Sequence, residues 1–449
     1  MSPFSGFHRQ NLSRLVVHGA AVFIACNVAL AGAQNVSFAQ KQTPPIAPQA
    51  KLALVDLTGH ISDAVGSPLP GATVYVYTAA PRVGTSPFCP SCYVDCGKHQ
   101  ATDAQGRFRI PAVDSSLIFR LLVVKEGYVS TFVPKVDPLQ SPLRATLKKS
   151  PAGSQDLQRQ VAGRVLDPDG HPVVGATVEP VGLQTGKNMT FGSIPGMDPL
   201  TITNARGEFR FDCPQPGSTV TARITARGLA PQVVADLKTG TRAPKTVTMA
   251  SGTTVAGTVR SATGAKMAGV TVEIVPVNRN IDTFVGWFEI GTDAEGKFSL
   301  PNIPAEQKYV ICVRMDSLAE KGMAMPRQAL ITGKNDTAAE GVNLTVQPAA
   351  AITGHIVLTD GKPIRPGTRI MLSRAETWDQ QQATLAEDGS FTFRGVPPEE
   401  ALEFNIQIPG HHVAENTPGY APGDPSVHLT FSEGSSPSDV RITLAPDAK

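Results

Sequence analysis

The chain has 449 residues, which is enough for two to four domains at roughly 100–200 residues per domain. Charged residues make up 17% of it and the formal net charge is +2. This balance leaves no basic surface to neutralise phosphates, so it argues against a nucleic-acid partner. The 41 glycines and 38 prolines, with 41% hydrophobic residues, favour many short strands separated by turns.

Residues 1–33 are predicted to form a signal peptide. They carry Arg9 and Arg14 without an acidic side chain, followed by an apolar stretch at 20–30 and small residues at 31–33. The apolar stretch is too short to span a bilayer.

A lipid anchor on Cys26 is the alternative interpretation of this segment. Residues 34–54 are expected to form a disordered leader. The mature chain is expected to carry no transmembrane anchor and to be secreted or periplasmic, in an oxidising compartment.

A fourfold internal repeat is the strongest feature of the sequence. Four segments share a pattern in which Thr or Ala is followed by Gly, one variable residue and then Val or Ile: Thr58–Ile61, Ala162–Val165, Ala256–Val259 and Thr353–Ile356. Each continues through a polar turn into a second apolar strand. The turns and strands predict the same local fold in every copy.

A second repeated motif lies further along each copy. It is a tight turn running into an alternating strand, at Thr102–Phe108, Thr203–Phe209, Thr292–Phe298 and, less faithfully, Ala386–Phe391. Asp or Asn can bond the backbone two residues on, and Gly accepts a positive φ. The Phe should then point inward while its charged neighbours point outward.

These repeats predict an all-β chain of four Greek-key β-sandwich domains with no helix of useful length. The expected domain bounds are 55–150, 160–250, 253–348 and 351–447, the last being the most divergent. Short closing strands are expected at Ala145–Leu147, Val247–Met249, Leu344–Val346 and Ile442–Leu444.

The two motifs together resemble the carboxypeptidase regulatory-like domain, over about residues 55–447. The resemblance implies a transthyretin-like (prealbumin-type) sandwich with an accessory role. In metallocarboxypeptidases the zinc chemistry lies on a separate α/β domain, for which this chain has no room. The fourth copy lacks the Gly-Ala after its first turn.

Motifs for catalysis are weak. His412 and Glu415 match a His-x-x-Glu zinc pair by spacing alone, and only His428 follows as a further histidine ligand. Asp167–Gly170 suggests a calcium loop, but the later ligand positions are missing and a turn is favoured. The chain is therefore predicted not to be an enzyme.

A cysteine-rich loop in the first copy offers Cys89, Cys92, Cys96 and His99. Three thiolates and an imidazole suit a structural zinc ion. A disulfide among the cysteines is favoured by export, with one thiol left over, and a redox pair or a free thiol is the remaining alternative. No other cofactor is expected. Cys213 and Cys312 are predicted to be buried small hydrophobic residues.

The same loop interval carries distinctive residues in every copy: the cysteines and Tyr93 in the first, an insertion at 183–200 in the second, then Trp287 and Trp378. Loops on rigid scaffolds often carry binding residues. Trp287, Trp378 and Tyr93 are therefore candidate ligand-binding residues. The alternative is that Trp287 packs on an edge strand.

The sequence thus favours a non-catalytic, exported protein that acts as an envelope or extracellular scaffold or as a protein-binding module. A carbohydrate-binding protein is the first alternative, and an accessory subunit of a separately encoded enzyme is the second. The expected partner is an envelope or extracellular protein or a polysaccharide.

Overall fold

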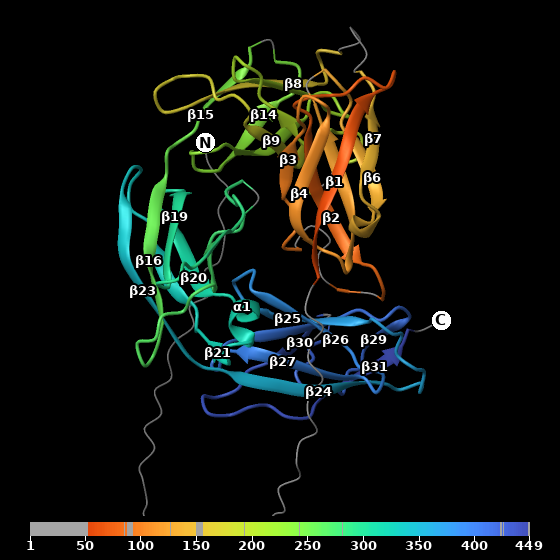
Figure 1. Cartoon of the computed structure of the whole chain (residues 1–449), viewed down its shortest axis with the longest axis vertical. Helices are drawn as coiled ribbons and strands as arrows, with labels where there is room; N and C mark the ends of the chain where they lie inside the picture. Colours follow the sequence, from red (N-terminus) through yellow and green to blue (C-terminus); the bar gives the residue numbers. More distant parts are fainter. Residues whose placement is uncertain are drawn as a thin grey trace, which may run out of the picture. The chain divides into compact units, whose positions relative to one another are not determined.

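The chain is almost wholly β-structure. The computed structural model describes residues 53–447 except 85, 88–92, 126, 150–155, 193, 242, 281, 423 and 425. The strands of these residues form sheets that pair into four sandwiches (Figure 1). The predicted all-β fold of tandem sandwiches is confirmed. The signal peptide and the leader predicted at 1–54 lie almost entirely outside the described residues.

The first two sandwiches follow one another along the chain. The first contains β1 (Leu54–Asp63), β2 (Thr73–Pro81), β3 (His99–Ala101), β4 (Arg107–Asp114), β5 (Leu117–Val124), β6 (Thr131–Val136), the 3-10 turn η1 (Pro138–Gln140) and β7 (Leu143–Leu147). The second contains β8 (Gln160–Leu166), β9 (Thr177–Thr185), β10 (Asn188–Phe191), β11 (Thr201–Ile202), β12 (Glu208–Asp212), β13 (Thr219–Thr225), β14 (Gln232–Lys238) and β15 (Lys245–Thr248).

The last two sandwiches are joined by Ala349 alone. The third contains β16 (Thr253–Ser261), β17 (Thr271–Pro276), β18 (Phe288–Gly291), β19 (Lys297–Ile303), β20 (Lys308–Val313), α1 (Met315–Ala319), β21 (Met323–Ala324), β22 (Gln328–Ile331) and β23 (Ala338–Pro348). The fourth contains β24 (Ala350–Leu358), β25 (Arg369–Arg374), β26 (Gln380–Thr384), β27 (Ser390–Val396), β28 (Leu402–Ile406), β29 (His411–Val413), β30 (Ser426–Leu429) and β31 (Val440–Pro446).

All four sandwiches share one topology. In one sheet the first strand lies between an antiparallel neighbour and the closing strand, with which it is parallel, as in the order β4-β1-β7. The other sheet has the order seen in β3-β2-β5-β6, and in the second sandwich both β10 and β11 pair with β9. The third and fourth sandwiches add the edge strands β21 and β29 to the first sheet. This arrangement is a Greek key.

The two sequence motifs meet across one strand pair in each sandwich. The motif glycine lies opposite the motif phenylalanine in the pairs Gly59–Phe108, Gly163–Phe209, Gly257–Phe298 and Gly354–Phe391. A Cβ on Gly163 would lie 2.3 Å from the Phe209 ring and 2.9 Å from the Lys245 carbonyl oxygen. The glycine therefore makes room for the inward ring and for the closing strand.

The threonine that opens the second motif has a structural role of its own. The Thr203 hydroxyl donates to the Val173 carbonyl at 2.6 Å and accepts from the Ala176 N–H at 2.8 Å. Thr102 and Thr292 make the same pair of bonds in their sandwiches. The buried hydroxyl thus links the hairpin to the turn before the second strand. The sequence repeat showed that this threonine recurs but not which groups it bonds.

Each sandwich encloses its own apolar core, and the core of the fourth sandwich includes one residue from the third. Met315, from helix α1 of the third sandwich, belongs to the buried cluster of the fourth sandwich and is 1% exposed. Helix α1 lies against β27 and β21 (Figure 1). With five residues it is far shorter than the about 20 needed to cross a bilayer, and no helix among the described residues is long and apolar enough to do so.

Candidate functional site at the junction of the third and fourth sandwiches

The structure brings the two tryptophans together. Trp287 lies in the loop between β17 and β18, and Trp378 lies in the matching loop between β25 and β26. Their ring centroids are 5.4 Å apart, and Phe284 lies 6.0 Å from Trp378. The Arg279 guanidinium lies 5.5 Å from the Trp378 ring. Matching loops of two sandwiches therefore form one aromatic cluster.

Both tryptophans are half-buried. The two acidic residues near Trp378 differ in their exposure. Glu376 is exposed, but Asp379 is 0% exposed. Asp379 is buried because its carboxylate pairs with a buried arginine, Arg374.

A buried ion pair lies beneath the aromatic cluster. Arg374, at the end of β25, and Asp379 are paired side chain to side chain with no exposed surface on either. Arg374 also donates to the Met325 carbonyl at 2.7 Å and to the Val313 carbonyl at 3.2 Å, both in the third sandwich. Asp379 accepts from the Met315 N–H at 2.9 Å. A pair contributed by the fourth sandwich thus satisfies main-chain groups of the third.

Glu273 reaches the same junction from β17 of the third sandwich. It is 0% exposed, and its Oε1 accepts the backbone N–H of Trp378 at 3.0 Å. Its Oε2 lies 3.7 Å from the Arg314 guanidinium and has no hydrogen-bond partner among the described residues. Burial, with the nearby Asp379 carboxylate, raises the pKa of Glu273 to about 7.

Two further arginines complete the charge cluster. Arg314 contacts Glu289 and Asp316 at 3.1 Å each. Arg327 crosses between the sandwiches, because its backbone N–H donates to Glu400 Oε1 at 2.8 Å. We call Glu273, Arg314, Arg327, Arg374, Asp379 and Glu400 the junction charge cluster.

The sequence reasoning missed this cluster, although a signal for it exists. Glu273 interrupts the apolar run Thr271–Pro276, and Arg374 ends the apolar strand that begins at Ile370. A charged residue in a strand that is buried on both faces must find a partner, because an unpaired buried charge is very costly. Sequence alone does not name that partner, since it comes from another sandwich.

Cys312, in β20, is 1% exposed, and burial raises the pKa of its thiol well above the ordinary value. Such a thiol is a poor nucleophile. Cys213 is 2% exposed, so the prediction that both cysteines are buried is confirmed.

The cysteine-rich loop is described only in part. Cys89 and Cys92 lie outside the described residues, so the zinc and disulfide alternatives stay predictions. Tyr93 is 7% exposed in the core of the first sandwich, and burial raises its pKa. His99 is exposed on β3, and its ring lies against Tyr75 with centroids 4.8 Å apart and the planes tilted by 31°. Cys96 is half-buried beside this core.

The other sequence candidates lie in turns or on edges. Asp167 Oδ1 accepts the backbone N–H of Asp169 at 3.0 Å and of His171 at 2.8 Å, which supports the turn interpretation. These three residues are the one group of three possible metal ligands among the described residues, and no ion is needed to explain their geometry. His412 and Glu415 are not part of such a group.

Comparisons with known proteins locate the family resemblance. No curated protein matches the chain. Among solved structures, the Bacillus anthracis TIE protein matches with a TM-score of 0.18 and 10% identity, covering 90% of this chain and 76% of that one. The major pilin subunit BcpA of Bacillus cereus matches with a TM-score of 0.17 and 11% identity, covering 66% of this chain and 100% of that one.

Because these TM-scores are low, only the family model carries a resemblance. The model of the carboxypeptidase regulatory-like domain matches residues 160–251, which contain all strands of the second sandwich. The second sandwich is therefore similar to a carboxypeptidase regulatory-like domain, and it stands in tandem with three sandwiches of the same topology.

Proposed function

We propose that this chain is an exported, non-catalytic scaffold that presents protein-binding surfaces on tandem β-sandwiches. One observation carries the proposal: the third and fourth sandwiches share a buried junction. Met315 fills the fourth core, and Arg374 caps carbonyls of the third sandwich. Such contacts hold two domains in one geometry, as a spacer or a composite binding surface requires.

Two further features support this proposal. The N-terminal residues have the composition of an export signal. The family model that matches the second sandwich describes a regulatory-like domain rather than a catalytic one. Fold alone does not assign a function, so the test must identify a partner.

Site-specific photocrosslinking of the full chain in its producing cells tests the scaffold. A photoreactive phenylalanine analogue replaces exposed apolar residues of three different sandwiches, Val65, Phe191 and Ile331, which are 86%, 59% and 68% exposed. A scaffold should yield a discrete protein adduct from at least one position. A photoreactive residue at buried Phe393 is the matched control and should yield none. Export is checked by fractionation of the same cells.

The second candidate function is carbohydrate binding, favoured by the half-buried tryptophan pair. Aromatic faces stack on apolar faces of sugars, and Trp287 keeps part of its ring at the surface. Polysaccharide affinity electrophoresis of the mature protein tests this candidate. Retardation that Trp287→Ala abolishes and Phe191→Ala leaves unchanged would support it. If the protein migrates unretarded through gels of a broad panel of polysaccharides but forms protein adducts in cells, the carbohydrate-binding proposal is rejected and the scaffold proposal is retained.

A further inference from the structure

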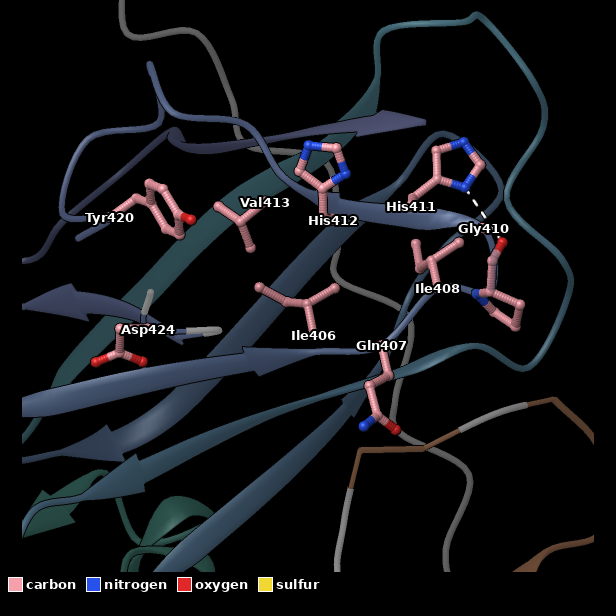
Figure 2. A pocket seen from close by; sticks show the side chains of 10 residues that line it. Ile406, Gln407, Ile408, Gly410, His411, His412, Val413, Tyr420 and Asp424 are labelled. Atoms are coloured by element: carbon pink, nitrogen blue, oxygen red, sulfur yellow. Dashed lines mark hydrogen bonds between the residues drawn. The ribbon is translucent and has the colours of Figure 1, made fainter. Parts of the chain in front are cut away.

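The fourth sandwich has a pocket of about 550 Å³ whose lining includes no residue of the junction charge cluster (Figure 2). Its lining comes from the end of β28, the following turn, β29 and the loop that carries Tyr420 and Asp424. Ile406, Ile408 and Tyr420 pack against the fourth core, and Val413 belongs to it. The pocket is thus an opening onto a hydrophobic core, with room for an apolar chain.

The lining carries one carboxylate. Among the described residues, Asp424 is the only Asp, Glu, Lys or Arg that lines the pocket, and His411 and His412 line it as well. The Asp424 carboxylate accepts the Ser426 N–H at 2.8 Å and lies 2.8 Å from His428 Nε2. The His428 and Ser426 contacts lower the pKa of Asp424, so this carboxylate is ionised at neutral pH. Its side chain keeps 39% of its surface exposed.

Lys362, which shares the Asp360 carboxylate with His411 of the lining, is already paired. Lys362 Nζ lies 2.8 Å from Asp360 Oδ2, and the same oxygen lies 3.3 Å from His411 Nε2. Asp447 adds a further carboxylate at the rim, 3.1 Å from His412 Nδ1. The surroundings of the pocket therefore favour a positively charged ligand.

The position of the pocket favours an extended polypeptide as the source of that ligand. β29 is the outer strand of its sheet. In the other sheet the outer side of β30 is partly covered, because the His428 N–H donates to the Gly419 carbonyl at 2.9 Å. An edge strand such as β29 offers main-chain groups along which an extended segment can lie. A side chain of that segment can then enter the pocket beside β29.

We propose that this pocket binds the lysine side chain of a partner polypeptide. The aliphatic stem lies against Ile406 and Ile408, and the ammonium group lies between the Asp424 carboxylate and the Tyr420 ring. Apolar burial of the stem, charge pairing and a cation–π contact then act together. This inference rests on the proposed protein-binding function and names the chemistry that one surface recognises.

The test uses n-hexylammonium as the probe and the full mature chain, with binding followed by saturation-transfer NMR. n-Hexanol and n-hexanoate have the same apolar stem and replace the ammonium by a neutral and an anionic group. We expect n-hexylammonium to bind about 10-fold more tightly than n-hexanol, and n-hexanoate more weakly still, with the preference for the cation reduced at high salt.

Asp424→Asn should abolish the preference for the cation, because the amide keeps the shape and loses the charge. Asp439→Asn is the matched control, since Asp439 also pairs with a histidine of the fourth sandwich, His355 at 3.5 Å, and does not line the pocket. The control should bind n-hexylammonium as the unaltered chain does. Unchanged thermal melting of both variants verifies folding.

Equal affinity for n-hexylammonium and n-hexanol, or an unaltered preference in Asp424→Asn, would overturn the inference. Its failure is distinguishable from failure of the scaffold proposal. Protein adducts in cells without ammonium binding would reject the pocket alone, whereas ammonium binding without any adduct would reject the scaffold and leave the pocket as a cation site.

Discussion

Arg374 and Asp379 form an ion pair without solvent-exposed surface, and both residues bond to main-chain groups of the neighbouring sandwich. Desolvating two charges offsets most of their attraction, so such a pair contributes little net stability over apolar residues. Losing one partner is far more costly, because the other charge stays buried. The pair therefore makes the position of the two sandwiches specific.

Arg374→Met should destabilise the junction by about 3–5 kcal/mol, since Asp379 would be buried without its cation. The measurement is urea denaturation followed by tryptophan fluorescence. The chain has only two tryptophans, and Trp287 and Trp378 both lie at this junction, so the signal is local. Lys245→Met, which breaks the largely exposed pair with Asp236 at 2.7 Å, should cost about 0–1 kcal/mol. Equal effects would contradict the assignment.

Met315→Ala should loosen the fourth sandwich although the residue belongs to the third. Removing a side chain that is 1% exposed leaves a cavity, at a cost of about 2–5 kcal/mol. The midpoint of the fluorescence transition should fall by the corresponding amount. Met189→Ala, at a residue 40% exposed on β10, should leave that midpoint unchanged. A Met315→Ala chain as stable as the original would show that the shared core is dispensable.

Glu273 should make the junction more stable in mild acid. Its pKa is raised from 4.5 to about 7 in the folded chain, so the folded state holds this proton more tightly than the unfolded state. The resulting stability is fully present below about pH 4.5 and is lost as the pH rises to about 7. The difference is on the order of 3 kcal/mol.

Denaturation midpoints measured from pH 4 to pH 8 check this sign. Glu273→Gln supplies an amide oxygen that can still accept the backbone N–H of Trp378, and it removes the titration. Its stability should therefore vary less over the same range. A variant whose pH profile parallels that of the original chain would assign the dependence to another group.

Gly163→Ala should destabilise the second sandwich by about 1–3 kcal/mol, because the added methyl group would press on the Phe209 ring and on a backbone carbonyl of β15. Far-ultraviolet circular dichroism during urea titration measures the effect. Gly291→Ala is the control, since a methyl group added there would meet no atom within 4 Å. A loss of stability in the control alone would refute the steric explanation.

Much of the fold could be predicted from the chain before its structure. The recurrence of a first strand with a central glycine and of an Asp-x-x-Gly turn indicated the sandwiches. Both motifs set the local backbone conformation through residues that are close in sequence. The closing strand expected at Ala145–Leu147 lies within β7, and the one expected at Ile442–Leu444 lies within β31. Local chemistry was sufficient for these elements.

The partners of isolated polar and apolar residues could not be predicted in this way. Glu273 and Asp379 are 106 residues apart in the numbering, and Met315 leaves its own sandwich to complete another. The two tryptophans could be placed in matching loops, but not against each other. By itself the sequence determined the repeated sandwich, because strand alternation and turn residues act locally. Only the tertiary structure decided the junction, because burial of a charge depends on which distant surface covers it.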